Sequence, residues 1–230
     1  MPKREFIEKM FDDIAPSYDK LDHLLSVGID KNWRRKAAKR LRQSKPLKVL
    51  DVACGTGDSI VALYKSGIRD LTGIDISRKM LAVAEKKLKR KYIDAKILHE
   101  DCASMSFEDE TFDAVTTFFG MRNFEDKKQC LAEMRRVLKP GGTLVVVELS
   151  EPRNKAVKSV YRLYFQRFTP WIGGKVSGNK NAYRYLPGSV AHFPQPTEFI
   201  EILHNAGFAD IKHKPLSFGI CRIYICKKTT

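Results

Sequence analysis

No stretch of this 230-residue sequence is both long and apolar enough to cross a bilayer. Apolar runs such as Leu144–Val147 are short, whereas a membrane-spanning helix needs about 20 apolar residues. The opening residues Met1–Phe6 are not followed by the apolar segment of a secretory signal peptide. These absences predict a cytoplasmic protein that does not span a membrane.

Paired cysteines and clustered metal ligands are also lacking. The five histidines are dispersed, and the five cysteines form no C-x-x-C pair and have no histidine at ligand spacing. These cysteines are Cys54, Cys102, Cys130, Cys221 and Cys226. Because zinc sites use closely spaced Cys and His ligands, we predict reduced thiols and no metal.

Linkers, repeats and low-complexity tracts are absent, and negative charge is scarce. The chain has 42 Lys and Arg against 27 Asp and Glu, a formal charge of +15. Nine basic residues and no acidic one lie between Lys31 and Lys48, and a second basic run spans Lys86–Lys91. The continuity predicts one domain over residues 1–230. The charge is consistent with a solvated helix face, RNA binding or contact with anionic membrane, and composition does not choose among them.

What the sequence does contain is a short apolar strand that stops in a glycine turn, within residues 47–60. The run Leu47–Val52 predicts a buried parallel strand, and Gly55 and Gly57 let the backbone turn sharply and approach a ligand. Position 60 is isoleucine, where a dinucleotide fingerprint would have a third glycine. The turn therefore predicts a ligand site that departs from the dinucleotide pattern, with a ligand-free turn as the alternative.

Acidic residues follow the next two predicted strands. Asp75 ends the strand over Leu71–Asp75, 18 residues beyond Gly57. This is close to the separation at which a carboxylate accepts hydrogen bonds from ribose hydroxyls in doubly wound folds. Asp101 and Cys102 follow the strand over residues 95–98. We expect Asp101 to accept a hydrogen bond from an adenine amino group, with a solvated turn carboxylate as the alternative.

The fourth predicted strand, Phe112–Phe119, leads directly to Arg122 and Asn123. In a doubly wound sheet this strand lies beside the first one, so its carboxyl end faces the ligand. Arg122 and Asn123 are therefore the catalytic candidates. A helix over Glu125–Leu138 and a fifth strand over Thr143–Leu149 follow.

Two flanking segments predict helices that cover the ligand side. Residues 3–25 have apolar positions at spacings of three and four, interrupted near Pro16, and predict a lid or a helix on the outside of the fold. Aromatic residues recur at helical spacing from Arg153 to Trp171, which is typical of core but also of an apolar substrate pocket. A helix and two terminal strands over residues 196–227 would complete a mixed seven-stranded sheet.

Several of these stretches resemble known motifs. Asp51–Asp58 is similar to motif I of class I S-adenosylmethionine-dependent methyltransferases. Arg136–Ser150, Phe119–Asn123 and Tyr183–Ser189 are similar to signatures of the C-methyltransferases of menaquinone and ubiquinone biosynthesis. The N-terminal signature matches in part, because Asp22 and Asp30 stand where that family usually has asparagine and histidine. The resemblance extends over nearly the whole chain.

The resemblance implies a Rossmann-like, doubly wound α/β fold in a single methyltransferase domain. The implied parts are an N-terminal helical lid (1–46), a cofactor-binding core (47–152), a helical and aromatic substrate cover (153–195) and a last helix with terminal strands (196–230). The implied cofactor is S-adenosylmethionine. The residues assigned to it are Gly55, Thr56, Gly57, Asp75, Asp101 and Cys102.

The family chemistry implies methyl transfer to a ring carbon of a polyprenylated quinol, most directly demethylmenaquinol. A phenol titrates at a pH of about 10, so we assign Arg122 to stabilise the phenolate, directly or through a water, and Asn123 to orient the ring. Tyr18 and Tyr185 are assigned to substrate binding. The basic run Lys31–Lys48 is assigned to peripheral docking at the inner membrane surface.

Two rival functions are compatible with the sequence. A methyltransferase of RNA or of another small molecule would keep the cofactor motifs, and RNA as substrate would explain the positive charge. No RNA-binding motif is appended, however, so nucleic acid is not an expected partner. A non-catalytic protein with a cofactor fold would keep the sheet but would have no use for Arg122 and Asn123.

Overall fold

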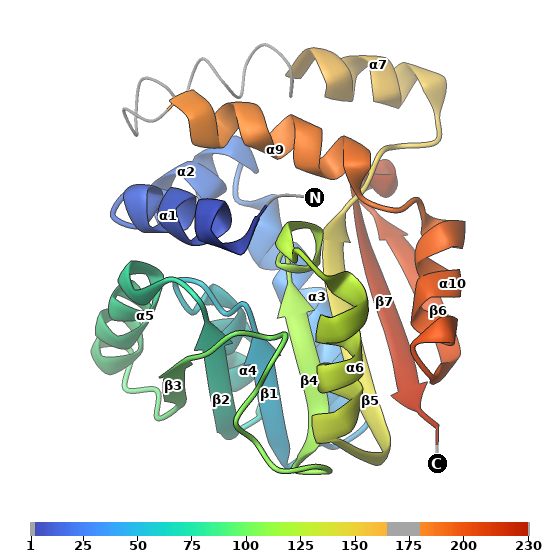
Figure 1. Ribbon diagram of the computed structural model, residues 1–230. Coiled ribbons are helices and arrows are strands. Elements are labelled where there is room, and N and C mark those ends of the chain that lie inside the picture. The colour runs from blue at the N-terminus through green and yellow to red at the C-terminus, as the bar shows by residue number, and fades with distance from the viewer. Residues whose placement is uncertain (1–2, 165–179, 230) are drawn as a thin grey trace.

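The computed structural model describes residues 3–164 and 180–229, and its centre is a seven-stranded sheet (Figure 1). The strand order is β3-β2-β1-β4-β5-β7-β6; the first five strands are parallel, and β7 runs antiparallel to both of its neighbours. The strands are β1 (Lys48–Val52), β2 (Asp70–Asp75), β3 (Lys96–His99), β4 (Phe112–Phe118), β5 (Leu138–Leu149), β6 (Phe208–Leu216) and β7 (Cys221–Lys228). The predicted mixed, doubly wound sheet is confirmed.

Helices cover both faces of the sheet and its upper end in Figure 1. They are α1 (Arg4–Ile14), α2 (Tyr18–Leu25), α3 (Ile29–Arg42), α4 (Asp58–Lys65), α5 (Arg78–Arg90), α6 (Lys127–Val137), α7 (Lys155–Leu163), α9 (Lys180–His192) and α10 (Pro196–Asn205), with short 3-10 helices η1 (Met121–Asn123) and η3 (Ser217–Gly219). None of the helices in the described ranges is long and apolar enough to cross a membrane.

The core forms because side chains alternate across the central strands. In β1, Leu50 and Val52 point to one face and pack in a cluster with residues of α6 and α10, whereas Val49 packs on the other face with residues of α3 and α4. Both faces are therefore closed by apolar helices. This arrangement leaves the carboxyl ends of the parallel strands as the open edge at which a ligand can bind.

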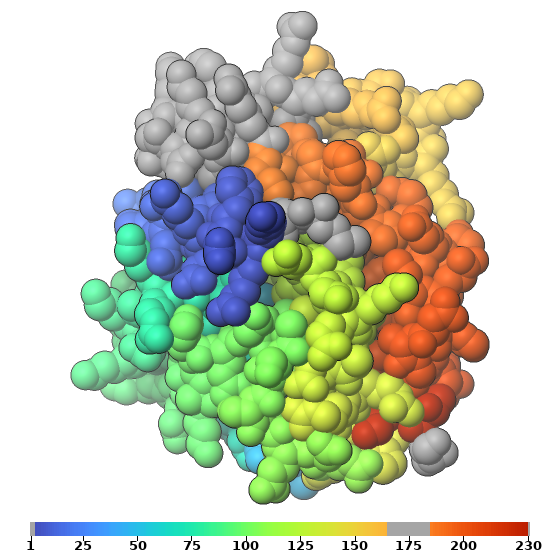
Figure 2. Space-filling model, viewed as in Figure 1, coloured from blue at the N-terminus to red at the C-terminus, as the bar shows by residue number. Residues whose placement is uncertain are grey.

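The N-terminal helices lie over that edge rather than on an outer face. Figure 2 shows the blue N-terminal segment meeting the orange helix α9 and the green segments that follow the strands. A separate apolar cluster holds α1 and α2 against α5, where Met80 packs with Ile7, Met10 and Leu21. The predicted interruption near Pro16 is confirmed, since α1 ends at Ile14 and α2 begins at Tyr18.

Some element boundaries differ from the prediction. Helix α6 begins at Lys127 rather than Glu125, because the Asp126 side chain accepts a hydrogen bond from the Gln129 N–H and caps the helix. Strand β5 begins at Leu138 rather than Thr143, since Leu138 pairs with Phe112 of β4.

The aromatic segment is described only in part. Helix α7 ends at Leu163, and the rest of the segment that was predicted as helix to Trp171 lies outside the described residues. Helix α9 lies within residues 153–195, which were expected to form a helical and aromatic cover, although no helix bounds were predicted there; it contains Pro187, which normally argues against a helix interior.

Candidate functional site

The turn after β1 has the backbone conformation that its glycines predict. Ala53, Gly55 and Gly57 have φ values of 57°, 54° and 83°. A Cβ atom at Gly57 would lie 3.2 Å from the Cβ of Ala84 on α5, so glycine suits both the φ angle and the close contact. The Gly55 N–H donates to Asp75 Oδ2 at 2.8 Å, which ties the turn to the end of β2.

Asp51, the first residue of the motif Asp51–Asp58, lies beneath the turn and stabilises it. Its fully buried carboxylate accepts hydrogen bonds from the hydroxyls of Ser59 and Thr116. Burial raises the pKa of Asp51 to about 6, although both hydrogen bonds act in the opposite direction. Asp51 thereby joins β1 to β4 and to the first turn of α4.

A cavity of about 210 Å³ lies at the carboxyl ends of β1, β2 and β3; we call it the cofactor cavity, after the ligand that the sequence predicts for its residues. It brings together most of the residues that were assigned to the cofactor, and Ile76 and Met80 add apolar surface. The assigned residues in its wall are Gly55, Thr56, Asp75, Asp101 and Cys102. Gly57 lies in the supporting turn. An apolar slot flanked by carboxylates suits a nucleoside, whose base is flat and whose ribose offers two hydroxyl donors.

Asp75 shapes the turn and also faces this cavity. Its two carboxylate oxygens accept hydrogen bonds from the N–H groups of Gly55, at 2.8 Å, and Ser77, at 2.9 Å. Burial raises its pKa, and these backbone hydrogen bonds oppose that effect. Each carboxylate oxygen can accept more than one hydrogen bond, so capacity for a ribose diol remains.

Asp101 and Cys102 come from the end of β3. Asp101 Oδ1 accepts a hydrogen bond from the Ala103 N–H at 2.9 Å, and its Oδ2 lies 3.1 Å from Arg4 Nη1 of α1. The Cys102 Sγ lies 2.7 Å from the Cys130 Sγ, and both thiols are buried. The hydrogen bond to Cys130 and burial raise the pKa of Cys102, so this thiol stays protonated.

Polar contacts tie α1 and α2 to each of the three strand ends around this cavity. They are the Arg4–Asp101 ion pair at 3.1 Å, the Ser77–Asp12 hydrogen bond at 2.6 Å and the Thr56–Asp19 hydrogen bond at 2.6 Å. The N-terminal helices thus cover the cofactor cavity, and the Thr56 hydroxyl already has a partner from the covering helix. That these helices open and close as a lid stays a prediction.

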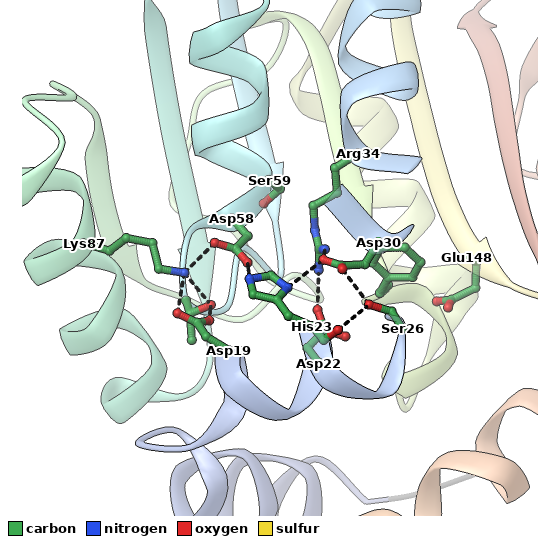
Figure 3. Close-up of polar contacts among 12 residues, drawn as sticks. Asp19, Asp22, His23, Ser26, Asp30, Arg34, Asp58, Ser59, Lys87 and Glu148 are labelled. Carbon is green, nitrogen blue, oxygen red and sulfur yellow. Dashed lines mark hydrogen bonds and ion pairs between the residues drawn. The ribbon is translucent and has the colours of Figure 1, made fainter. Parts of the chain in front are cut away.

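Figure 3 shows charged residues in this region that the sequence analysis missed. Lys87, from the second basic run, is buried and pairs with Asp19 at 2.7 Å and with Asp58 at 2.5 Å. Burial raises the pKa of Asp58, but the positive charges of Lys87 and Arg34 lower it by more than burial raises it, so the net shift is downward. Lys87 is therefore not part of a solvated face.

Arg34, from the first basic run, is buried in the same way. Its guanidinium pairs with Asp22 at 3.0 Å and with Asp30, two of the positions at which the chain departs from the family pattern. His23 lies 3.1 Å from Asp30 and 3.4 Å from Asp58. The ligand atoms of Asp22, His23 and Asp30 lie within 4.8 Å of one another, and the positive charge beside them is that of Arg34.

A second cavity, of about 600 Å³, lies among α1, α2, α7 and α9 above the end of β4. Most of its wall is apolar, with aliphatic and aromatic side chains from each helix. It shares Phe11, Tyr18, Phe119 and Asn123 with the cofactor cavity. The two cavities are therefore neighbours, and these four side chains lie at their boundary.

Arg122 lies in the wall of the larger cavity, and it is paired with a carboxylate that the sequence analysis did not identify. Its Nη1 lies 2.7 Å from Oε1 of the fully buried Glu148 and donates to the Phe119 carbonyl at 2.5 Å. Burial lowers the pKa of Arg122, but Glu148, Tyr18 and Tyr185 together raise it more, so the net shift is upward and the guanidinium stays charged. Its buried Nε has no acceptor within the part of the chain that the structure describes.

Asn123 and Tyr185 are hydrogen-bonded to each other at the cavity boundary. The Tyr185 hydroxyl of α9 donates to Asn123 Oδ1 at 3.0 Å, and both residues line the larger cavity with Tyr18. Burial raises the pKa of Tyr185. The structure thus brings together Arg122, Asn123, Tyr18 and Tyr185, which the sequence analysis had assigned to the reaction or the substrate.

Comparison with known proteins identifies relatives along the whole chain. The sequence model of the ubiE/COQ5 methyltransferase family matches residues 2–228. The demethylmenaquinone methyltransferase of Bacteroides fragilis is 43% identical over 98% of this chain and 94% of that protein. A ubiquinone/menaquinone biosynthesis C-methyltransferase of Geobacter sulfurreducens is 44% identical over 98% of this chain and 90% of that protein.

Solved structures agree on the fold. The cyclase SpnF has a TM-score of 0.72 at 17% identity, covering all of this chain and 98% of that one. Haemonchus contortus phosphoethanolamine N-methyltransferase 2, solved with S-adenosyl-L-methionine, has a TM-score of 0.58 at 16% identity, covering 89% of this chain and 57% of that one.

Proposed function

Because the chain belongs to the ubiE/COQ5 methyltransferase family and is an S-adenosylmethionine-dependent C-methyltransferase of quinone biosynthesis, we propose that its substrate is demethylmenaquinol. The observation that carries the proposal is the boundary that the two cavities share, with Tyr18, Phe119 and Asn123 on it. A nucleoside-sized slot flanked by carboxylates, beside a larger apolar cavity, suits a methyl donor and a hydrophobic ring substrate.

S-adenosylmethionine supplies an electrophilic methyl group on a sulfonium. In the proposed site Asp75 accepts hydrogen bonds from the ribose hydroxyls, Asp101 and the Cys102 backbone face the adenine, and Thr56 with the Gly55–Gly57 turn holds the remainder. Asp101 is half of an ion pair with Arg4, and Thr56 donates to Asp19. We therefore expect cofactor entry to require displacement of α1 and α2.

The protein's contribution to the chemistry is to raise the electron density of the ring and to orient it. A ring carbon is a poor nucleophile until the neighbouring hydroxyl loses its proton, and a phenol titrates at about pH 10. We assign Arg122 to donate a hydrogen bond to that oxygen as it becomes negative. Since Glu148 already balances the guanidinium charge, this donor acts as one end of a fixed dipole rather than as a free cation.

The hydrogen bond between Tyr185 and Asn123 provides a test of ring orientation. Replacing Tyr185 with phenylalanine removes a donor to Asn123 Oδ1, and a net hydrogen bond is worth about 0.5–1.5 kcal/mol. We expect kcat to fall roughly 3- to 10-fold with unchanged cofactor affinity. Steady-state kinetics with calorimetry checks this. In a protein that already carries Asn123→Ala, adding Tyr185→Phe should cause no further fall in kcat. Independent, additive effects of the two substitutions on kcat would contradict the shared role.

The basic run Lys31–Lys48 stays our proposed contact with anionic membrane, but not all of its residues can take part. Arg34 within it is buried and paired, so the exposed members are the ones that can reach lipid; they are Lys31, Arg35, Lys36, Lys39, Arg42 and Lys45. Such side chains attract anionic lipid from within about 10 Å at an ionic strength of about 0.1 M.

One assay tests the proposed function against the rival substrates. The protein is incubated with S-adenosylmethionine carrying a labelled methyl group, together with reduced demethylmenaquinone or with bulk RNA. We expect label in the quinol fraction and none in RNA, because the larger cavity is lined mainly by apolar side chains. Label in RNA, or in neither, would reject the proposal.

A further inference from the structure

Large apolar side chains that face solvent gather around the mouth of the larger cavity. We call this set the apolar rim; its members are Leu24, Val27, Ile29, Val160, Leu163 and Phe218. Val27, Ile29 and Val160 also line the cavity, and Phe218 follows the lining residue Ser217. Isolated exposed apolar residues are ordinary, but a patch at the mouth of a cavity marks an interaction surface.

Three segments that are distant in sequence meet to form the rim. The Tyr164 hydroxyl at the end of α7 donates to the Leu25 carbonyl of α2 at 2.7 Å. Trp33 Nε1 of α3 donates to Ser217 Oγ of η3 at 2.9 Å. These hydrogen bonds place the α2–α3 corner beside both other segments, at the upper end of the molecule in Figure 1. The rim is therefore one surface rather than scattered residues.

Backbone conformation holds two rim side chains outward. Val27 and Phe218 lie at loop tips with φ of 52° and 57°, and they are 79% and 84% exposed. A β-branched or bulky residue at positive φ is strained, and such positions favour glycine or asparagine. Strain of this kind persists at sites of function more often than elsewhere, and here it presents apolar side chains to solvent.

Charge around the rim is mainly positive. The segments 24–35, 155–164 and 212–220 contain one carboxylate, Asp30, which is buried against Arg34. Glu151, just before α7, pairs with Lys158 at 2.5 Å and lies 3.7 Å from Arg162. The exposed cations of the three segments are Lys31, Arg35, Lys155, Arg162, Lys212 and Lys214. Apolar tips surrounded by cations are the pattern by which a protein inserts shallowly into an anionic bilayer.

We propose that the apolar rim is the surface by which the protein docks on an anionic phospholipid bilayer, with the larger cavity opening toward the lipid. The proposal rests on the proposed function for its reason, because a polyprenylated quinol resides in the bilayer and its tail can then stay in lipid while the ring enters the cavity. In this proposal the apolar rim makes the apolar contact with the bilayer, and the basic run of α3 lies beside that contact.

The test compares two double variants in flotation with vesicles of phosphatidylcholine and phosphatidylglycerol. Leu163→Gln with Phe218→Asn removes two exposed rim side chains that do not line the cavity, and the second change relieves positive-φ strain, so we expect the variant to fold. The control, Leu47→Asn with Tyr92→Asn, removes side chains that are 79% and 92% exposed at the opposite end of the sheet, and Tyr92 also has positive φ (53°). We expect the vesicle partition coefficient to fall at least tenfold for the rim variant and less than twofold for the control.

Further measurements identify what binds the apolar rim. They also distinguish a failure of this inference from a failure of the proposed function. Vesicles of phosphatidylcholine alone, or added salt, should weaken binding of the native protein. The rim variant should lose methylation of demethylmenaquinol in vesicles but keep methylation of a short-chain analogue in buffer. Equal flotation of the rim variant and the native protein, or rim-dependent dimerisation without vesicle binding, would overturn the docking surface. A native protein that floats through its rim but methylates no quinol would instead overturn the proposed function.

Discussion

Replacing Arg122 with alanine is expected to lower kcat at least about 100-fold, since one donor to an oxygen that becomes negative in the transition state is worth about 2.7–4 kcal/mol in other enzymes. Cofactor affinity should be unchanged, because Arg122 lines the larger cavity and is not among the residues that line the cofactor cavity. Turnover at saturating quinol, together with calorimetric titration of S-adenosylmethionine, measures the two effects separately.

A structural effect of the same change has to be distinguished from the catalytic one. Without Arg122 the Glu148 carboxylate is fully buried and loses its ion pair, and such a loss costs about 3–5 kcal/mol of stability. The double variant Arg122→Met with Glu148→Gln removes both charges and should recover much of that stability, as urea unfolding would show. Its turnover should stay low. Recovery of turnover along with stability would mean that Arg122 acts through the fold alone.

Replacing Asp75 with alanine should weaken the binding of S-adenosylmethionine by about 100-fold or more. Each hydrogen bond to a charged group is worth about 1.5–3 kcal/mol, and 1.4 kcal/mol corresponds to a factor of about ten in affinity. Calorimetry measures the change directly. Unchanged affinity would remove Asp75 from the cofactor site.

The Asp75 carboxylate also holds the N–H groups of Gly55 and Ser77, so weaker binding could follow from a distorted turn. A cofactor analogue that lacks the ribose 2′-hydroxyl separates the two causes. The native protein should bind this analogue more weakly than the full product S-adenosylhomocysteine, whereas Asp75→Ala should bind both alike. A variant that still discriminates between them would assign Asp75 to the turn rather than to the ribose.

Local sequence patterns were sufficient for the sheet and for bringing most of the assigned cofactor residues to one cavity at its edge. Strand β1, the glycine turn and Asp75 are close in sequence and share one edge, since parallel strands in a doubly wound sheet place their carboxyl ends together. Ser77 as the cap of α5 was predictable for the same reason, because a cap is a contact within one turn of helix. A strand boundary differed from the prediction where pairing with a neighbouring strand made the strand longer, as β4 does for β5 at Leu138.

The partners of the site residues were not predictable from local pattern. Glu148 was read as one residue of a buried strand, although a single carboxylate in the run Val145–Leu149 is a signal that a buried cation must face it. Arg34 and Lys87 were counted within basic runs that looked solvated, yet both are buried and paired with carboxylates of α2, α3 or α4. Asp30 precedes Arg34 by one turn of α3, but the other partners lie on other elements, and one sequence carries no record of such contacts.

The sequence by itself determined the fold, the cofactor turn and the identity of Arg122 and Asn123 as the residues at the end of the fourth strand, because periodicity, turn chemistry and short-range spacing are local properties. Only the tertiary structure decided that α1 and α2 cover the cofactor cavity, that Arg122 is paired with Glu148, and that the apolar tips Val27 and Phe218 surround one cavity mouth. These are contacts between segments far apart in the chain, and they depend on how the helices pack over the sheet rather than on the order of residues within any one of them.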